Sequence, residues 1–273
     1  MYKALFTDID GTLLNKSREI TPATKIEIQR ITVEQNIPVI LISSRMPKAM
    51  KHLHEELKLN SPIIAYNGAL ILKSTEITNL SDILFSATIS SGTVRAINNF
   101  KEKCDFHISL YYNDDWFVEG MDYWANREVT STKVNPSITS HEFVIRDWEG
   151  KNIGAHKVMC MGETEEIEKL FNWLGSNFSN ELNLYRSKPT YIEITPSVVS
   201  KATAVSMITK YLNISEAQAI AVGDNYNDLE MLKSVGLGIS MGNAPDSVKA
   251  AAAHITLSNN EDGLAEAIRK YFK

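Results

Sequence analysis

The chain has 273 residues, of which 44% are hydrophobic and 22% charged. This composition is typical of a folded globular protein and excludes a disordered or fibrous chain. The formal net charge is -5 and the Lys and Arg residues are scattered, so we expect no nucleic-acid partner. The length lies near the size at which one hydrophobic core divides into two, which predicts a main domain and a smaller one.

The sequence contains no segment that indicates a membrane span or a secretion signal. No apolar run approaches the ~20 residues that a spanning helix needs, and two aspartates follow the first strand-like residues directly. Cys104 and Cys160 are too few and too far apart for a disulfide framework or a zinc site, and we expect both to be buried. We therefore predict a cytoplasmic protein without a membrane partner, and the sequence gives no indication of its oligomeric state.

The first third of the chain alternates short aliphatic runs with helical patterns. Residues 3–7 predict a strand, and Thr21 followed by Pro22 predicts the start of a helix that runs to about residue 35. Residues 37–42 are almost all aliphatic, which indicates a strand covered on both faces. A helix at 47–58 and a strand at 63–66 follow, and Asn67-Gly68 marks a turn. This alternation is typical of a parallel α/β sheet.

Residues 82–188 have a different texture, with more aromatic and Asn residues and strand-like pieces at 106–112, 116–119 and 156–161. Ile167, Leu170, Phe171 and Leu174 have helical spacing and form one apolar stripe. A helix on one face of an antiparallel sheet accounts for this pattern. We therefore predict that residues 82–188 form an inserted α+β domain.

The α/β rhythm returns near residue 191. We expect strands at 191–195 and 219–222, helices at 201–212 and 227–234, and a helix at the C-terminus. The predicted fold class is α/β: a Rossmann-like parallel sheet with helices on both faces, built from residues 1–81 and 189–273, with the inserted domain between these two parts.

Two aspartates follow the first predicted strand. Asp8 and Asp10 lie in the run Asp-Ile-Asp-Gly-Thr at residues 8–12, at a strand end where open α/β sheets bind ligands. Residues two apart on a strand point the same way, so both carboxylates are expected to emerge together and to need a cation or a shared proton. An ordinary turn explains the pair equally well when it is taken alone.

A second acidic run, Gly-Asp-Asn-Tyr-Asn-Asp at residues 223–228, follows another predicted strand. Taken alone, Asp224 and Asp228 are explained more simply as helix caps than as site residues. Two such runs at the ends of parallel strands bring four carboxylates to one sheet edge, and hard oxygen ligands of this kind suit Mg²⁺.

Hydroxyl and cationic side chains occur at corresponding positions. Ser43 and Arg45 follow the strand predicted at 37–42, and Lys201 begins a helix. Each is more simply a helix cap or a surface charge when taken alone. They supply the hydrogen-bond donors and the positive charge that phosphate chemistry requires, and the carboxylates supply the nucleophile and the metal ligands.

These motifs resemble those of the haloacid dehalogenase superfamily, and within it the Cof-type phosphatases with a large inserted α/β cap. Residues 8–12 resemble the first motif, Ser43 the second, Lys201 the third and residues 223–228 the fourth. Segments at Asn67-Gly68, at Glu193, at 241–244 and at 261–263 are also similar to this subfamily. The resemblance covers the whole predicted core, with the region between 82 and 188 as the cap.

The resemblance implies a role for each site residue. Asp8 would attack phosphorus, and Asp10 would act as general acid and base. Mg²⁺ would be bound by Asp8, the backbone carbonyl of Asp10 and Asp224, with Asp228 supporting from just outside. The phosphoryl oxygens would be bound by Ser43, Lys201 and Asn227, and Arg45 is a further residue on the substrate side.

The function implied is hydrolysis of a small phosphorylated metabolite, such as a sugar phosphate or a phosphorylated cofactor, through an aspartyl-phosphate. A phosphomutase of the same fold is one alternative, because it would return the phosphate to its substrate. A ligand-binding or regulatory module without turnover is another. The complete set of acidic groups argues against that module, since binding alone needs no nucleophile beside a general acid.

Overall fold

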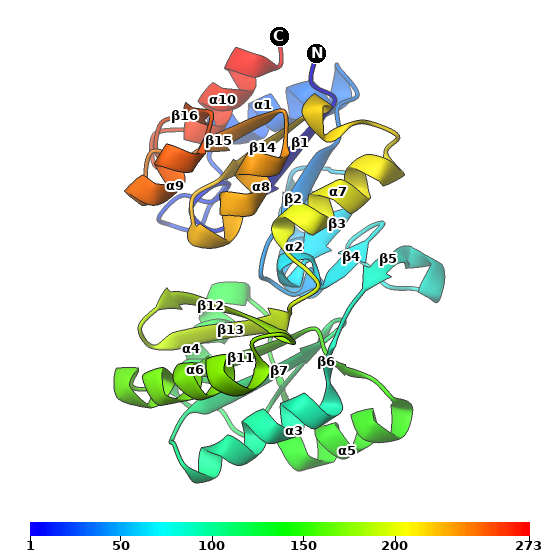
Figure 1. The fold of residues 1–273 in the computed structure, drawn as a ribbon. Coiled ribbons are helices and arrows are strands. Elements are labelled where there is room, and N and C mark those ends of the chain that lie inside the picture. The colour runs from blue at the N-terminus through cyan, green and yellow to red at the C-terminus, as the bar shows by residue number, and fades with distance from the viewer. The chain divides into compact units, whose positions relative to one another are not determined.

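A computed structural model describes residues 1–273, apart from the side chain of Ser187. The chain divides into two compact units. The first consists of Met1–Ser44, Met50–Leu84 and Ser200–Lys273, and the second of Arg45–Ala49 and Phe85–Val199. The chain leaves the first unit after Leu84 and returns to it at Ser200 (Figure 1).

An eight-stranded sheet forms the centre of the first unit. Its strands, in spatial order, are β16 (His254–Ile255), β15 (Leu237–Ser240), β14 (Ala219–Gly223), β1 (Ala4–Asp8), β2 (Val39–Ile42), β3 (Ile63–Ala65), β4 (Leu70–Leu72) and β5 (Ile83–Ser86). The strands from β16 to β3 pair in parallel, and β4 turns back antiparallel to β3. The mixed α/β class predicted from the sequence is confirmed.

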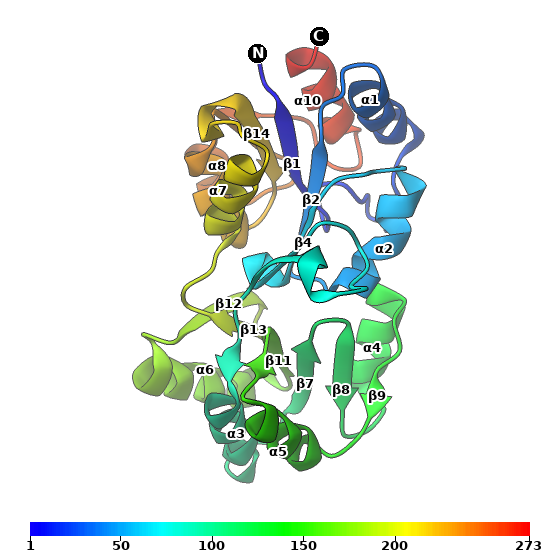
Figure 2. The same cartoon turned by 90° about the vertical axis from the view of Figure 1, so that its right-hand side faces the viewer.

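Helices cover both faces of this sheet. They are α1 (Pro22–Val33), α2 (Pro47–Glu56), α7 (Lys201–Tyr211), α8 (Leu229–Ser234), α9 (Asp246–Ala251) and α10 (Gly263–Tyr271). The pair α1 and α10 packs together on one face, and α7 packs against α8 on the other (Figure 2). Coverage on both sides explains why every residue of β2 is buried, as the aliphatic run predicts.

Local signals in the sequence set several element boundaries. The Thr21 hydroxyl accepts a hydrogen bond from the backbone N–H of Thr24, and Pro22 takes the first helical position of α1. The turn predicted at Asn67-Gly68 connects β3 to β4, with residues Tyr66–Gly68 in a short 3₁₀ segment. The first unit contains three further 3₁₀ segments, at Leu80–Asp82, Glu216–Gln218 and Tyr226–Asp228.

The second unit contains a six-stranded sheet in the order β12 (Leu182–Lys188), β13 (Tyr191–Pro196), β11 (Lys157–Met161), β7 (His107–Tyr112), β8 (Asp115–Val118) and β9 (Ser137–Ile138). Two short strands, β6 (Ile89–Ser90) and β10 (Gly154–Ala155), pair separately. Its helices are α3 (Ser91–Asn99), α4 (Tyr123–Thr132), α5 (His141–Lys151) and α6 (Thr164–Phe178), with a 3₁₀ segment at Phe100–Glu102.

One apolar cluster holds the second unit together. Alternate residues of its strands, such as Ile108 and Leu110 of β7, pack with apolar residues of α3, α5 and α6. In α6 the stripe predicted from the sequence is buried at Ile167, Leu170 and Leu174, and Phe171 packs against the cluster. Cys104 and Cys160 are buried and free. The second unit therefore has its own hydrophobic core.

One strand lies in a different sheet from the one expected. The strand at 191–195 forms as β13, but it pairs antiparallel with β11 and β12 in the second unit. The α/β rhythm of the sequence predicts this strand in the parallel sheet, and that prediction is wrong. An apolar run predicts a strand but does not identify its partners, and here the seven-residue β12 next to it in the chain supplies the partner.

Among the residues that the structure describes, no helix combines the length and the hydropathy that crossing a bilayer requires.

Candidate active site

The site lies in the first unit, at the carboxyl edge of the parallel sheet. Asp8 is the last residue of β1, where Asp8 is in register with Ile42 of β2, and Thr7 with Val222 of β14. The segments that follow β2 and β14 therefore begin at the same edge as Asp8. This edge is where open α/β sheets bind ligands.

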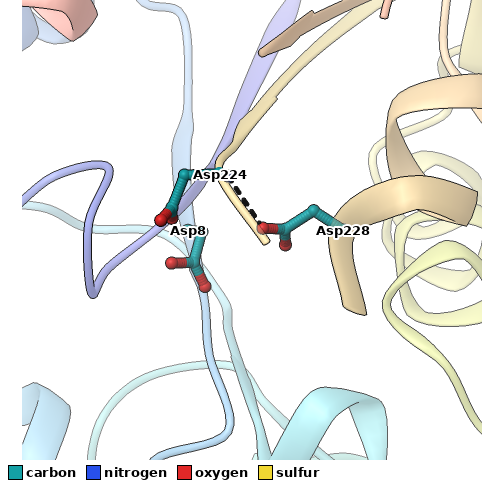
Figure 3. A group of neighbouring side chains, drawn as sticks. All are labelled: Asp8, Asp224 and Asp228. Carbon is teal, nitrogen blue, oxygen red and sulfur yellow. Dashed lines mark hydrogen bonds between the residues drawn. The ribbon is translucent and has the colours of Figure 1, made fainter. Parts of the chain in front are cut away.

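Three carboxylates meet at this edge (Figure 3). Asp8, Asp224 and Asp228 each offer an oxygen, and these oxygens lie within 4.8 Å of one another. The Lys201 Nζ, at the first residue of α7, contacts Asp8 Oδ1 at 2.5 Å and Asp228 Oδ1 at 2.6 Å. All four side chains are buried or half-buried, so one ammonium partly neutralises three closely spaced carboxylates.

Asp228 connects the loop after β14 to Lys201. Its Oδ2 accepts hydrogen bonds from the backbone N–H groups of Asp224 and Asn225, both at 2.9 Å. A Cβ on Gly223 would lie 2.5 Å from the Asp228 carboxyl carbon, so glycine is required there. Both oxygens of Asp228 thus have partners within the protein, which suits a residue that supports the loop and Lys201.

Asp224 is held by residues of two other loops. The Thr12 hydroxyl donates to Asp224 Oδ1 at 2.9 Å, and Asn243 Nδ2 lies 3.4 Å from Asp224 Oδ2. The same Asn243 nitrogen donates to the Gly11 carbonyl at 2.9 Å. Gly11 has a φ of 88°, and a Cβ there would lie 2.3 Å from Asp224 Oδ2. The loop after β1 therefore needs glycine for its close approach to Asp224.

The crowding of charge changes the proton affinity of the cluster. Burial raises the pKa of Asp224 from the usual 3.8 to about 7, the charge of Asp228 adds to the increase, and the Thr12 hydrogen bond and Lys201 oppose it. Burial also raises the pKa of Asp8 well above its usual range, against the opposing effect of Lys201. Burial alone would lower the pKa of Lys201, but Asp228 and Asp8 outweigh it and raise that pKa. The cluster therefore favours a bound cation or a bound proton.

Asp10 lies just beyond the end of β1. The strand ends at Asp8, and Asp10 is exposed in the following turn, where its backbone bridges to Leu14. Strand alternation ends where the strand ends, so it does not by itself set the direction of the Asp10 carboxylate, and the joint position of the two carboxylates stays a prediction. Asp10 still lies within electrostatic reach of Asp224, since its charge contributes to the raised pKa there.

The remaining predicted site residues fall into two groups. Ser43 directly follows β2 and is buried, and Asn227 lies in the loop after β14, where its Nδ2 donates to Asn67 Oδ1 at 3.1 Å. Both belong to the unit that carries the carboxylates. Arg45 groups with the second unit, and its guanidinium donates to the Ala49 carbonyl at 3.4 Å.

Sequence reasoning assigned no role to two residues that hold Asp224. Thr12 ends the run at residues 8–12, and Asn243 follows β15, so both occupy strand-end segments where such a role could have been sought. A hydroxyl and an amide carry little signal in a single sequence, because each is common in turns.

Comparison with known proteins identifies the relatives of this chain. Residues 5–268 match the family described as haloacid dehalogenase-like hydrolase. A protein of Haemophilus influenzae that is named as a candidate phosphatase is 35% identical over 100% of this chain and 99% of its own. A 5-amino-6-(5-phospho-D-ribitylamino)uracil phosphatase of Bacillus subtilis is 29% identical over 98% of this chain and 95% of its own.

The fold is also similar to that of solved structures. A haloacid dehalogenase-like hydrolase from Bacteroides thetaiotaomicron is 29% identical, with a TM-score of 0.87 over 99% of both chains. The fold and the acidic strand-end site thus define a hydrolase of the phosphatase class. The chain belongs to the haloacid dehalogenase-like hydrolase family, as its motifs predict.

Proposed function

We propose that the protein is a Mg²⁺-dependent phosphatase that hydrolyses a small phosphorylated metabolite through an aspartyl-phosphate on Asp8. The observation that carries this proposal is the buried Lys201, whose ammonium contacts both Asp8 and Asp228 within a group of three carboxylates. The ammonium keeps one Asp8 oxygen in a fixed position. Such preorganisation suits a carboxylate nucleophile.

The reaction follows from the positions of these groups. An Asp8 oxygen attacks phosphorus, a bond forms between that oxygen and phosphorus, and the bond to the leaving oxygen breaks. Asp10 donates a proton to the leaving oxygen and then removes a proton from the water that hydrolyses the aspartyl-phosphate. Its exposed position outside the carboxylate cluster supports this separate role. The phosphoryl oxygens are bound by Ser43, Lys201 and Asn227.

The donor set fits a hard divalent cation. The Asp8 and Asp224 carboxylates and the Asp10 carbonyl would bind Mg²⁺, with Asp228 supporting from just outside, and Mg²⁺ would supply positive charge to the transferring phosphoryl group. Three carboxylates against one ammonium leave negative charge that a cation offsets. The raised pKa of Asp224 supports the same inference, since burial and the charge of Asp228 both disfavour its ionised form, which a bound cation would favour.

The second unit acts as a cap that selects the substrate, and the catalytic core is the discontinuous remainder of the chain. The second unit has its own hydrophobic core, which supports a function separate from that of the catalytic core. The substrate class is a small phosphate monoester, such as a sugar phosphate or a phosphorylated cofactor. The B. subtilis relative, whose named substrate carries a phosphate on a ribityl chain, supports that class.

The test is a screen of phosphorylated metabolites with and without Mg²⁺. Chelator-treated enzyme should release no inorganic phosphate, and Mg²⁺ should restore release. Asp224→Asn should need at least about tenfold more Mg²⁺ for half-maximal activity, since it removes one charged ligand. Asp246→Asn is the matched control, because Asp246 is exposed at the start of α9 and should leave activity unchanged.

Full activity in metal-free enzyme would overturn the Mg²⁺ site. Phosphate that appears at another position of the substrate, in place of free phosphate, would instead indicate a mutase.

A further inference from the structure

The turn after β3 has an uncommon backbone. Three successive residues have positive φ angles: Tyr66 at 52°, Asn67 at 55° and Gly68 at 106°. Only glycine adopts this region without cost, and an aromatic residue there is a clear outlier. Such outliers persist where the surrounding structure fixes them, and they are concentrated at functional sites. The turn therefore needs an explanation beyond connecting two strands.

The turn contacts three segments that carry the proposed site. The Asn67 backbone N–H donates to the Ser43 carbonyl at 2.9 Å, and Asn67 Oδ1 accepts from Asn227 Nδ2 at 3.1 Å. A Cβ on Gly68 would lie 2.7 Å from the carbonyl oxygen of Ser200, the residue before Lys201. Asn67 thus lies where the segments after β2 and β14 and the start of α7 approach one another.

One donor of this turn has no acceptor. The Asn67 side chain is 1% exposed, and its Nδ2 has no hydrogen-bond partner among the residues that the structure describes. A buried N–H group without a partner is destabilising, so such groups are rare unless a ligand completes them. The Asn227 amide orients the Asn67 side chain, because its Nδ2 pairs with Oδ1 and leaves the Asn67 nitrogen unpaired.

We propose that Asn67 is an additional phosphate-binding residue, whose Nδ2 donates to a phosphoryl oxygen while Oδ1 holds Asn227. This assignment rests on the proposed function, because it needs an oxyanion at the site. An oxyanion is the acceptor that an amide donor between Ser43 and Asn227 would meet, since both neighbours are proposed to bind the same group. The positive φ angles are then explained, because they turn the backbone so that the Asn67 side chain lies beside Asn227, where an extended strand would not bring it.

Asn67→Asp separates this role from a structural one. The variant keeps the shape and the acceptor for Asn227, but it replaces the N–H donor with a charged oxygen that repels phosphate. We expect the affinity for inorganic phosphate, measured by titration calorimetry with Mg²⁺ present, to fall about 10- to 100-fold. Asn213→Asp is the matched control, because Asn213 has the same φ of 55° but is exposed beyond the end of α7. That control should bind phosphate like the wild type.

Asn67→Gly provides a second variant if the new charge disturbs folding. Glycine tolerates the positive φ and keeps the backbone hydrogen bond to Ser43, but it removes the whole side-chain amide, including the acceptor of Asn227. Its thermal unfolding should stay close to that of the wild type, and its phosphate affinity should fall at least about fivefold.

Wild-type phosphate affinity in both Asn67 variants would overturn the assignment, whether or not the protein turns over substrates. A wild-type protein that neither binds phosphate nor hydrolyses any phosphate ester would overturn the proposed function as well. A wild type that hydrolyses esters while both variants bind phosphate normally would overturn only the role of Asn67.

Discussion

At the scale of single residues, Lys201 is the side chain on which the charge balance depends. Its ammonium is buried between Asp8 and Asp228, and both contacts are within hydrogen-bond distance. Removing one member of a buried ionic group leaves its partners uncompensated, which costs far more than loss of a surface pair. Lys201 therefore has a structural effect besides its proposed contact with phosphate.

Lys201→Met should lower the free energy of unfolding of the metal-free protein by about 3–5 kcal/mol, measured by urea denaturation at neutral pH. Lys169→Met is the control, because Lys169 pairs with Glu166 on the surface of α6 and its loss should cost at most about 1 kcal/mol. Equal losses for the two variants would contradict the role given to the buried ammonium.

The raised pKa of Asp224 should make the proposed Mg²⁺ binding dependent on pH. The folded protein binds a proton at Asp224 up to about pH 7, whereas the unfolded chain releases it near 3.8. Stability of the metal-free protein at this group is therefore present at low pH and decreases as pH rises from about 4 to 7. Mg²⁺ must displace the same proton, so its affinity should fall roughly tenfold per pH unit below pH 7.

The increase in Tm produced by a fixed Mg²⁺ concentration should thus be larger at pH 8 than at pH 5.5. Equal increases at the two pH values, or a larger one at pH 5.5, would contradict this linkage. Asp224→Asn should remove much of the difference, because its amide does not titrate.

At the scale of secondary-structure elements, two glycines in the second unit differ in the space around them. Gly175 lies within α6, where an added Cβ meets nothing within 4 Å. Gly154 lies in β10, where an added Cβ would be 1.8 Å from the carbonyl oxygen of Ile89. The same substitution should therefore have opposite effects.

Gly175→Ala should raise the free energy of unfolding by about 0.5–1 kcal/mol, because alanine restricts the unfolded chain and favours a helix. Gly154→Ala should lower it by about 1–3 kcal/mol, because the pair of β6 and β10 must separate. Both changes can be measured by urea denaturation of the intact protein. Stabilisation by Gly154→Ala would contradict the described pairing.

Elements with strong local signals could be predicted from the sequence, and those that depend on distant partners could not. The cap at Thr21 and the aliphatic run in β2 fix their elements locally. The sequence predicts β13 in the wrong sheet, because an apolar pattern does not indicate which strands will pair with it. At the site, the strand-end rule found Asp8, Asp224 and Asp228, but it missed Thr12 and Asn243, whose roles arise only from loops that meet in space.

At the scale of the whole molecule, the two units have separate cores and, as we propose, separate tasks. Replacing residues 85–199 with a short Gly/Ser linker should leave a sheet unit that still binds Mg²⁺ and slowly hydrolyses p-nitrophenyl phosphate. It should lose its preference among metabolites, because the cap is proposed to select them. Rates of phosphate release across a metabolite panel provide the measurement. A selectivity profile like that of the intact protein would place the specificity in the first unit and contradict the proposed cap.

The reaction proposed for the whole molecule depends on a phosphorylated Asp8. Asp8→Asn should abolish turnover of every substrate, because an amide cannot form the acyl-phosphate. Asp10→Asn should be slowed about 10²–10⁴-fold with alkyl phosphates, because these need a proton donor, and much less in its first step with p-nitrophenyl phosphate. Asp8 is buried and Asp10 is exposed, although both lie in the same short motif. The two substitutions should therefore have different effects on the two steps of the reaction.

The most direct measurement is a rapid-quench experiment with p-nitrophenyl phosphate and Mg²⁺, with mass detection of phosphate on the protein. Asp10→Asn should produce a burst of p-nitrophenolate and accumulate phosphate on Asp8, because its second step lacks the base that activates water. Asp8→Asn should produce neither. A burst in Asp8→Asn, with phosphate located on another residue, would contradict the account.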